Sequence, residues 1–490
     1  MAMNFLPEMS EIRKIAAEGK YRVLPVSCEI LSDICTPIEA LDILKNVSAH
    51  CYLLESAKQD ETWGRYTFLG FDPRLEITCR DGEMKAGSIR FHTENPSGYI
   101  RQVLADYRSP RFPYLPPFTG GLVGYFSYDY LGYSEPAVRT GAEDTERFRD
   151  VDLMLFDKVI AFDNFRQKII LIANMQLDEG ETAYNRAVME LKQLAGLLKT
   201  GKKKREPGGH LLGEVKPLFE KQEFCRMVEA AKSHIREGDI FQIVLSNRLE
   251  APFEGSLFNT YRILRTMNPS PYMFYFSGTD VEVAGASPET LVKLEDGVLH
   301  TFPLAGTRPR GGTPEEDEKL EAELLSDEKE LAEHNMLVDL GRNDLGKVSE
   351  FGSVQVEKLH SVERFSHVMH IGSTVRGKLR EGCDALDALE AVLPAGTLSG
   401  APKIRACQLI GELENNKRGI YGGAIGYIDF AGNMDTCIAI RIAYKKGGKV
   451  FVRSGAGIVA DSVPEKEYEE CINKAKAVVN AMKRAKEADL

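Results

Sequence analysis

The stretch "GGAIGYIDFAGNMDTCIAIRIAYKKGGKVFVRS", residues 422–454, decides the fold class, because short apolar runs alternate in it with glycine-containing turns. We predict three strands, joined by turns at 431–433 and 446–448. Connections this short imply antiparallel pairing. Arg441 alternates with Ile440 and Ile442, so its side chain should point to the opposite sheet face and either pair with a carboxylate at a site or form a structural salt bridge.

The same β pattern recurs earlier in the chain. Near the N-terminus, "CYLLES", "RYTFLGF" and "KIILIANM" have the composition of strands. A helical stripe that begins at Phe224 ends at Gly238, and the strand-like runs "IFQIVLSNRL", "PYMFYFSG" and "TLVKLEDGVLHTF" follow it, the last with a hairpin turn at Asp296-Gly297. Because helices lie between blocks of strands, we predict an α+β fold built in layers rather than a doubly wound parallel sheet.

The segment "LKTGKKKREPGGHLLGE", residues 198–214, has a basic run, a Gly-Gly pair and a proline, and it lacks apolar periodicity. These features are typical of a linker. We therefore predict an N-terminal region at 1–200, a linker at 201–214 and a C-terminal region at 215–490. A chain of 490 residues is long enough for two or three ordinary domains.

The bulk composition limits the possible partners. A formal net charge of -11 would repel nucleic acid and an anionic membrane surface, so a small-molecule or protein partner is expected. The start, "MAMNFLPEMSEIRK", lacks the apolar core of a signal peptide, and no run approaches the roughly 18 apolar residues of a membrane span. The nine cysteines form no C-x-x-C pair. We expect a cytoplasmic protein with reduced thiols and no membrane partner.

A first pair of glutamates lies in "SDEKELAEHNMLVDLGRND", residues 326–344, which we predict as a helix that is capped by Asp327 and ends at Gly341. Glu330 and Glu333 would lie one turn apart on a face that also carries leucines. Two carboxylates placed in this way repel each other and lose hydration unless a cation compensates them. A metal ion and pairing with buried arginines are the two alternatives.

A second pair lies in "DSVPEKEYEECINKAKAVV", where Ser462 and Glu465 are expected to form a capping box. Glu467, Glu470 and Lys474 would share one stripe of this helix. Such a stripe taken alone is typical of a solvated surface. The two pairs together, with no paired His or Cys beside them, favour a hard ion such as Mg²⁺.

Three segments rich in small residues are candidates for binding an anion. In "TFPLAGTRPRGG", residues 301–312, glycines and arginines occur at a density that argues against a regular strand. In "RSGAGIVADSVPE", Gly455, Ala456 and Gly457 should form a strand-to-helix turn, either as an anion cradle or as a tight turn alone. "PAGTLSGAPK", residues 394–403, offers Thr397 and Lys403 as possible contacts and lacks the spacing of a P-loop.

His370, in the β-like run "RFSHVMHIGSTVRG", has no partner at a metal-ligand spacing. Its ordinary pKa suits a proton shuttle near neutral pH, and a satisfied core histidine is the other interpretation.

Eight motifs occur together in a fixed order along the chain: "LLES", "NPSPYMFYF", "GASPE", "PLAGTRPRG", "DEKELAEHNMLVDLGRND", "PAGTLSGAPK", "YGGAIGY" and "GAGIVADSVPEKEYEE". In this order they resemble the chorismate-utilising enzymes, and among these the anthranilate synthase component I family. The resemblance spans nearly the whole chain. It implies a sandwich of mainly antiparallel β-sheets flanked by helices, with the active site in the C-terminal region.

The resemblance also implies roles for particular residues. It assigns Mg²⁺ to Glu330, Glu333, Glu467 and Glu470, and the ion would hold the ring carboxylate of chorismate. Glu289 would protonate the departing C4 hydroxyl, His370 would assist removal of the C2 proton, and Thr397 matches a further active-site position. The positions that match contacts to the two substrate carboxylates are Gly306, Thr307, Tyr421, Arg441, Gly455, Ala456, Gly457 and Lys474.

Two single residues indicate the nucleophile. Aminodeoxychorismate synthases of the family carry an attacking lysine where this chain has Ala305, and isochorismate and salicylate synthases carry a water-activating lysine where it has Gln242. With neither lysine present, the resemblance implies ammonia, which needs no base to expose its lone pair. A separate glutamine amidotransferase subunit would supply it, because the chain has no G-x-C-x-G nucleophile elbow.

The resemblance further implies feedback inhibition by L-tryptophan. The residues that match the family's tryptophan site are Glu55, Ser56, Arg65, Pro271, Tyr272 and Met273. Inhibition would require tryptophan to favour a state that binds chorismate less well or responds less to the partner.

Overall fold

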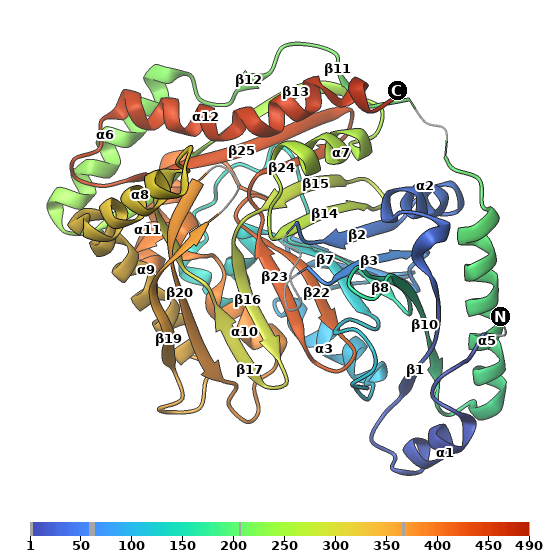
Figure 1. Cartoon of the computed structure of the whole chain (residues 1–490). Coiled ribbons are helices and arrows are strands. Elements are labelled where there is room, and N and C mark those ends of the chain that lie inside the picture. Colours follow the sequence, from blue (N-terminus) through green and yellow to red (C-terminus); the bar gives the residue numbers. More distant parts are fainter. Residues whose placement is uncertain (1–2, 58–63, 205–206, 365–367, 490) are drawn as a thin grey trace.

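The computed structural model describes residues 3–57, 64–204, 207–364 and 368–489. In this part of the chain the strands form two large sheets whose strand pairs are antiparallel (Figure 1). This confirms the predicted α+β class with layered antiparallel sheets. None of the helices within the described ranges has the length and the apolar run needed to cross a membrane.

The first sheet has the strand order β1-β10-β9-β3-β2-β14-β15-β24-β25-β13-β11, with β12 and β21 also paired to β13. Its strands are β1 (Val23–Leu31), β2 (Cys51–Glu55), β3 (Tyr66–Phe71), β9 (Lys158–Asp163), β10 (Lys168–Gln176), β11 (His210–Leu211), β12 (Lys216–Pro217), β13 (Gln242–Glu254), β14 (Tyr272–Ser277), β15 (Glu282–Ser287), β21 (Gly400–Ala401), β24 (Ile442–Lys446) and β25 (Lys449–Ile458).

The second sheet has the order β18-β20-β17-β16-β23-β22-β7-β8-β4-β5-β6, with β19 also paired to β20. Its strands are β4 (Leu75–Arg80), β5 (Glu83–Ala86), β6 (Ile89–His92), β7 (Gly121–Phe126), β8 (Val151–Phe156), β16 (Thr290–Glu295), β17 (Val298–Thr301), β18 (Leu304–Pro309), β19 (Gln355–Arg364), β20 (Val368–Lys378), β22 (Ala424–Asp429) and β23 (Met434–Ile438).

The helices cover the outer sides of these sheets (Figure 1). The α-helices are α1 (Met9–Ala17), α2 (Pro37–Val47), α3 (Pro96–Asp106), α4 (Leu131–Ser134), α5 (Gly180–Thr200), α6 (Lys221–Glu237), α7 (Phe258–Met267), α8 (Pro314–Ser326), α9 (Glu328–Gly346), α10 (Ala385–Val392), α11 (Lys403–Glu414) and α12 (Pro464–Lys483). Short 3₁₀ turns lie at Ser32–Ile34, Tyr128–Tyr130, Pro136–Val138, Gly396–Leu398 and Ala485–Asp489.

The largest core cluster fills the space between the sheets, since it joins residues such as Phe274 and Ile172 of the first sheet to Tyr125 and Ile425 of the second. Both sheets combine strands from before and after the expected linker at 201–214: β2 pairs with β14, and β7 pairs with β22. The two regions of the sequence are therefore interleaved within shared sheets.

The stretch 422–454 forms four strands rather than the three that we predicted. The run "TCIAIRIAY" breaks after Ile438, and the chain passes there from β23 in the second sheet to β24 in the first. Arg441 lies in this break with φ +52, so it does not alternate within a strand as expected. A left-handed conformation interrupts the period of two on which that prediction depended.

A second connection between the two sheets lies beside this break, where the chain passes from β15 in the first sheet to β16 in the second. The N–H of Ile438 donates to the Glu289 carbonyl (3.0 Å), and the N–H of Ala286 donates to the Arg441 carbonyl (3.2 Å). The Ser287 hydroxyl donates to the carbonyl of Ile438 (2.7 Å). These bonds hold Glu289 and Arg441 side by side where the chain twice changes sheet.

Candidate active site

Glu289 is the candidate general acid. The Thr397 hydroxyl donates to its Oε1 at 3.0 Å. Burial raises the pKa of Glu289 to about 7, although the Thr397 hydrogen bond and the charges of Arg441 and Lys474 oppose the rise. A carboxyl group with this pKa carries a proton at and below neutral pH and can give it to a leaving group.

His370, on β20, is the candidate base. Its Nδ1 lies 2.8 Å from the Gly306 carbonyl and 3.1 Å from the Thr307 hydroxyl. Donation to that carbonyl places the proton on Nδ1 and makes Nε2 the basic nitrogen. Burial and the charge of Arg441 lower the pKa of His370, so the ring is neutral near pH 7 and can accept a proton.

The segment 301–312 contains the strand β18 at Leu304–Pro309, which corrects the expectation that no strand forms here. β18 pairs with β20, and its register shifts between Ala305 and Arg308. This bulge gives Gly306 a φ of +67, and a Cβ there would lie 3.2 Å from Oε2 of Glu330. The backbone conformation therefore requires a glycine, and its missing side chain leaves room for the Glu330 carboxylate.

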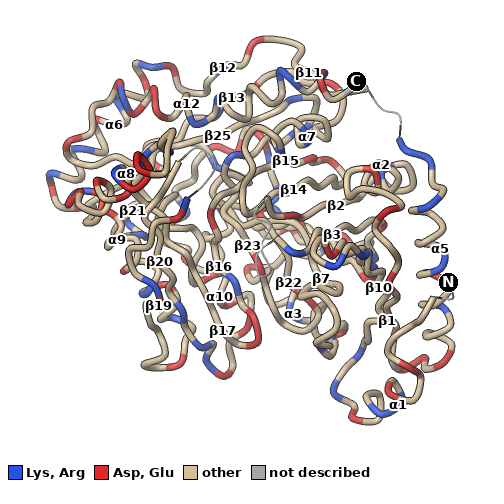
Figure 2. The backbone as a smooth tube through the Cα atoms, in the orientation of Figure 1, with Lys and Arg blue, Asp and Glu red and all other residues tan. Residues whose placement is uncertain are grey.

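The two arginines of this segment bind acidic side chains. Arg308 forms ion pairs with Asp327 (2.8 Å), Glu323 (3.1 Å) and Glu330 (3.3 Å), and Arg310 pairs with Asp317. Figure 2 shows that acidic residues gather along α8. These arginines anchor α8 and the start of α9.

Gly455, Ala456 and Gly457 are interior residues of β25 and pair with Ser246, Leu245 and Val244 of β13. The predicted strand-to-helix turn is therefore wrong, and these residues do not lie at a helix N-terminus. The strand must be glycine-rich because a Cβ on Gly455 would lie 2.8 Å from the Leu245 carbonyl and 2.9 Å from the Tyr421 hydroxyl.

We expect Gly455→Ala to destabilise the protein by about 1–3 kcal/mol, because the new methyl group meets a backbone oxygen that cannot move away. Gly457→Ala is the matched control, since its nearest neighbour is the Gln242 side-chain nitrogen (3.0 Å), which can turn aside. Thermal unfolding of both variants measures the difference. Equal melting temperatures would contradict the packing argument.

Two cations lie near the acid and the base. Arg441 has no ion pair with a carboxylate of the described residues, and burial lowers its pKa. Lys474 bonds the Gly455 carbonyl (3.1 Å) and pairs with Glu470 (2.7 Å), so it joins β25 to α12. Tyr421 is 2% exposed and lies against Gly455. A partly desolvated guanidinium suits a carboxylate ligand.

The two glutamate pairs come from α9 and α12, and the charge of Glu470 on α12 acts on Glu333 of α9. Partial desolvation and the charges of Glu330 and Glu470 raise the pKa of Glu333, although its side chain has access to solvent. Partial desolvation and Glu470 also raise the pKa of Glu467. Glu330 and Glu470 have cationic partners, Arg308 (3.3 Å) and Lys474 (2.7 Å), so the like-charge effects fall on Glu333 and Glu467. The four carboxylates supply oxygen donors of the kind that a hard divalent ion takes.

The ends of these helices differ from the prediction. α9 is capped by Asp327 as expected but continues past Gly341 to Gly346. Gly341 allows close packing, because a Cβ there would lie 3.1 Å from Thr301 Cγ2. At α12 the N-cap is Val463, and the Ser462 hydroxyl accepts from the N–H of Val459 (3.1 Å), so the predicted capping box does not form.

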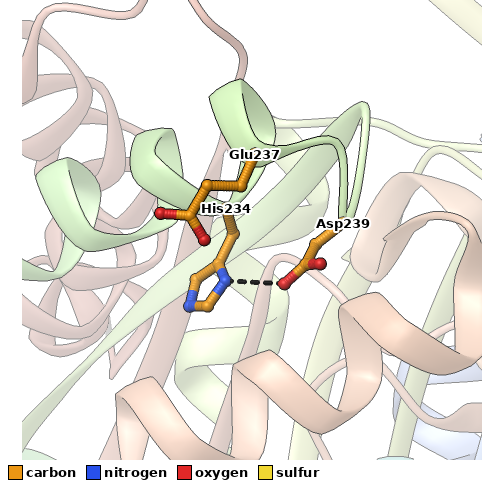
Figure 3. Close-up of side chains that lie close together, drawn as sticks. All are labelled: His234, Glu237 and Asp239. Atoms are coloured by element: carbon orange, nitrogen blue, oxygen red, sulfur yellow. Dashed lines mark hydrogen bonds and ion pairs between the residues drawn. The ribbon is translucent and has the colours of Figure 1, made fainter.

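Another group of possible metal ligands is His234, Glu237 and Asp239 at the C-terminal end of α6 (Figure 3). His234 Nδ1 lies 2.9 Å from Asp239 Oδ2, and Arg405 donates to the same oxygen at 3.1 Å. A bound arginine already supplies the positive charge, so this cluster joins α6 to α11 and gives no reason to expect an ion.

All six residues of the expected tryptophan site line one cavity of about 520 Å³ between the two sheets. Glu55 accepts from Arg265 Nε (2.6 Å), and Arg65 pairs with Asp163 (2.7 Å). The Tyr272 hydroxyl lies 2.9 Å from the Thr290 hydroxyl, next to Glu289 in sequence. The cavity is large enough for a single amino acid.

The sequence did not predict two groups of buried ion pairs near the candidate site. Lys403, suggested above as a possible contact, instead pairs with Asp344 (2.6 Å), and both side chains are buried. Glu414 binds Arg418 and Arg453 in a fully buried cluster. Their charges lie on α9 and α11, in the segment after α11 and on β25, where a charged residue in the sequence alone indicates a solvated surface.

Comparison with known proteins agrees with this arrangement. A sequence model of the family described as chorismate binding enzyme matches residues 49–480. The chain therefore belongs to the chorismate-binding enzymes, which confirms the family indicated by its motifs.

Named relatives narrow the assignment. The chain is 45% identical to an anthranilate synthase component 1 of Acetivibrio thermocellus and 46% identical to one of Aquifex aeolicus, with 99% of each chain covered. The crystal structure of anthranilate synthase component I from Streptococcus pneumoniae superposes with a TM-score of 0.77 and 38% identity, covering 92% of this chain and 98% of that one. Within the family, the chain belongs to the anthranilate synthase component I group.

An isochorismate synthase of Escherichia coli, 20% identical with a TM-score of 0.70 over 97% of this chain and 98% of that chain, shares the fold.

Proposed function

We propose that this protein converts chorismate and ammonia to anthranilate and pyruvate, the first committed step of L-tryptophan biosynthesis, as a Mg²⁺-dependent lyase. The observation that carries the proposal is the arrangement around Arg441. Burial raises the pKa of Glu289 against the charge of Arg441, and burial and the same charge lower the pKa of His370, which supports a proton-donating acid and a neutral base beside Arg441. The residues at the two positions of the alternative nucleophiles are Ala305 and Gln242, and neither can act as an amine.

The chemistry follows from these groups. Ammonia adds to C2 of the ring as the C4–O bond breaks, Glu289 gives its proton to the departing C4 hydroxyl, and water leaves; the new ammonium group then releases one proton, which can return to Glu289. His370 Nε2 accepts the C2 proton as the C3–O bond breaks, which makes the ring aromatic. The departing enolpyruvate takes up one proton on its methylene carbon and becomes pyruvate. Arg441 and Lys474 hold the substrate carboxylates, with the backbone at Gly306, Thr307 and Gly455–Gly457 and the Tyr421 hydroxyl around them.

Glu330, Glu333, Glu467 and Glu470 would hold the Mg²⁺ ion. When bound, the ion neutralises a substrate carboxylate and fixes its position. The raised pKa values of Glu333 and Glu467 support the assignment, because the like charges that raise them would be offset by a divalent cation.

The proposal is tested with purified protein, chorismate, Mg²⁺ and ammonium salt, in the absence of a partner. We expect anthranilate and pyruvate in equal amounts. Aminated product without pyruvate would identify an enzyme that stops at 2-amino-2-deoxyisochorismate, or an aminodeoxychorismate synthase. No turnover of chorismate would point to a silent regulatory protein. Either outcome overturns the proposal.

We further propose that ammonia comes from a glutamine amidotransferase subunit. The relatives' name "component 1" supports a second component. With that subunit present, glutamine should replace ammonium salt as the nitrogen source.

We also propose that L-tryptophan binds in the inter-sheet cavity and inhibits the enzyme. The bond from Tyr272 to Thr290 supports this regulation, because it connects the cavity wall to the segment that carries Glu289. If the protein has two conformations that differ at this wall, L-tryptophan would favour the one that it binds more tightly. The position of the Glu289 side chain would then change with the wall.

We expect Glu55→Gln to raise the L-tryptophan concentration that halves the activity by about 10-fold, because the ammonium group loses a charged acceptor. Glu295→Gln, on the opposite wall of the cavity, is the matched variant. Indole-3-propionate, which has no ammonium group, should inhibit the parent and Glu55→Gln equally. An unchanged tryptophan response in Glu55→Gln would refute the assignment of Glu55.

A further inference from the structure

Arg418 lies in the segment between α11 and β22, and its side chain is 1% exposed. Its Nη1 donates to the Leu398 carbonyl (2.6 Å), and its Nη2 donates to the Val244 carbonyl (2.7 Å). The guanidinium carbon lies 4.6 Å from the centre of the Tyr128 ring. One side chain therefore joins two backbone segments that are far apart in the sequence.

A carboxylate fixes the orientation of this guanidinium. Glu414 accepts from Arg418 Nε (3.0 Å) and Nη2 (2.6 Å), and it also accepts from the Ser246 N–H (2.8 Å) and from Arg453 Nη2 (2.7 Å). The paired bonds from a planar fork allow only one direction for the remaining N–H groups. These groups point at the two carbonyls.

Both carbonyls belong to parts of the candidate site. Leu398 follows Thr397, whose hydroxyl bonds the acid Glu289, and Val244 is the register partner of Gly457. Lys403 donates to the Val392 carbonyl at the start of this loop, and the strand pair β13–β21 holds its far end. From outside the loop, Arg418 bonds the Leu398 carbonyl directly after Thr397, and the Val244 N–H donates to the Ser399 carbonyl (2.9 Å) one residue further on.

We propose that Arg418 is a positioning residue for the reaction: by fixing the Leu398 carbonyl relative to β13, it aims the Thr397 hydroxyl at Glu289. The inference rests on the proposed function for the role of Glu289. A buried ion pair contributes little net stability compared with an apolar replacement, so the specific geometry is the feature for which Arg418 is required.

The test is a double-mutant cycle on Arg418→Lys and Thr397→Val, scored by chorismate consumption and by the pH dependence of kcat/KM. Lysine keeps the charge and loses the fork, so we expect kcat to fall roughly 10- to 100-fold. In Thr397→Val the ionised form of Glu289 loses a hydrogen-bond donor, so the pKa of Glu289 should rise. The alkaline limb of the kcat/KM profile should then move up by about one pH unit. Arg418→Lys should move the limb in the same direction, and the double variant should add little to Thr397→Val alone.

Arg441 and Lys474, the charged groups that act on Glu289, are unchanged in these variants, so a shift of the limb reports the Thr397 contact. Arg453→Lys is the matched control. Arg453 is buried and binds the same Glu414, but its other bonds go to Ser246, Asn416 and Lys417, away from the loop. The fold loss in kcat of Arg453→Lys should multiply with that of Thr397→Val in the double variant, and Arg453→Lys should leave the alkaline limb of the kcat/KM profile unchanged.

The proposal is overturned if the fold losses in kcat of Arg418→Lys and Thr397→Val multiply in the double variant. It is also overturned if the alkaline limb of the kcat/KM profile does not move in Arg418→Lys. If Arg418→Lys does not fold, Tyr128→Leu loosens the guanidinium more mildly and is put through the same cycle, with the same expected coupling at smaller size. Failure of the proposed function is separate, because it shows as a wild-type product other than anthranilate, while the cycle follows chorismate whichever product forms.

Discussion

Glu289→Gln should lower kcat by about 10²- to 10⁴-fold, because glutamine keeps the shape and removes the proton that the leaving hydroxyl requires. Burial places the pKa of Glu289 at about 7. Only the protonated form acts as the acid, so wild-type kcat/KM should fall as the pH rises through about 7. In Glu289→Gln the residual activity should lack this limb.

A pH profile of both proteins at saturating Mg²⁺ makes the measurement. Glu295→Gln is the control, since it removes a carboxylate at the end of β16 that pairs with Arg111 (2.9 Å) in the segment between α3 and β7. Glu289→Gln with more than a tenth of the parent kcat would refute Glu289 as the general acid.

Glu470→Gln should raise the Mg²⁺ concentration needed for half-maximal activity by roughly 100-fold, because one of few anionic ligands is lost. The neighbour Glu469 supplies the control: it lies on the same helix, is 63% exposed and pairs with Lys221 (3.1 Å). Glu469→Gln should leave the Mg²⁺ dependence unchanged.

Calorimetric titration with Mg²⁺ checks the same point without turnover. Full activity and unchanged Mg²⁺ affinity in Glu470→Gln would refute the metal assignment. Loss of affinity in both variants would show a general effect of charge on α12 rather than a ligand.

Much of the fold could be predicted from local patterns. The strands at Cys51–Glu55 and Lys168–Gln176, the hairpin at Asp296-Gly297 and the helix that ends before Gly238 all follow from alternation, turn residues and helical stripes. What local patterns do not contain is the partner of each strand. Pairing of β2 with β14 depends on contacts more than 200 residues apart, so the interleaving of the two regions was not visible.

The site errors come from glycines and from one interrupted strand. Glycines at 306, 455 and 457 were interpreted as turns, although each lies in a strand; Gly306 has a φ of +67, and a Cβ on Gly455 would meet the Leu245 carbonyl at 2.8 Å. Arg441 looked like a strand residue because the apolar run continues through the break at 439–441. Glycine signals a close approach as readily as a turn, and only the fold shows which applies.

The residues that perform the chemistry could be predicted from the sequence more readily than the residues that position them. The order of the motifs indicated Glu289, Thr397 and His370, and the structure brings Thr397 to Glu289 and His370 to Gly306. Arg418 gave no signal, because its importance lies in two backbone carbonyls that the sequence does not identify.

In the proposed reaction ammonia attacks the ring directly, without a covalent intermediate on the protein. Mass spectrometry of the products formed from chorismate, Mg²⁺ and ¹⁵N-labelled ammonium, together with the mass of the intact protein during turnover, distinguishes this route from the others. We expect ¹⁵N-anthranilate with an equal amount of pyruvate and a protein of unchanged mass. Isochorismate as the product, or a ring adduct on the protein, would contradict this route.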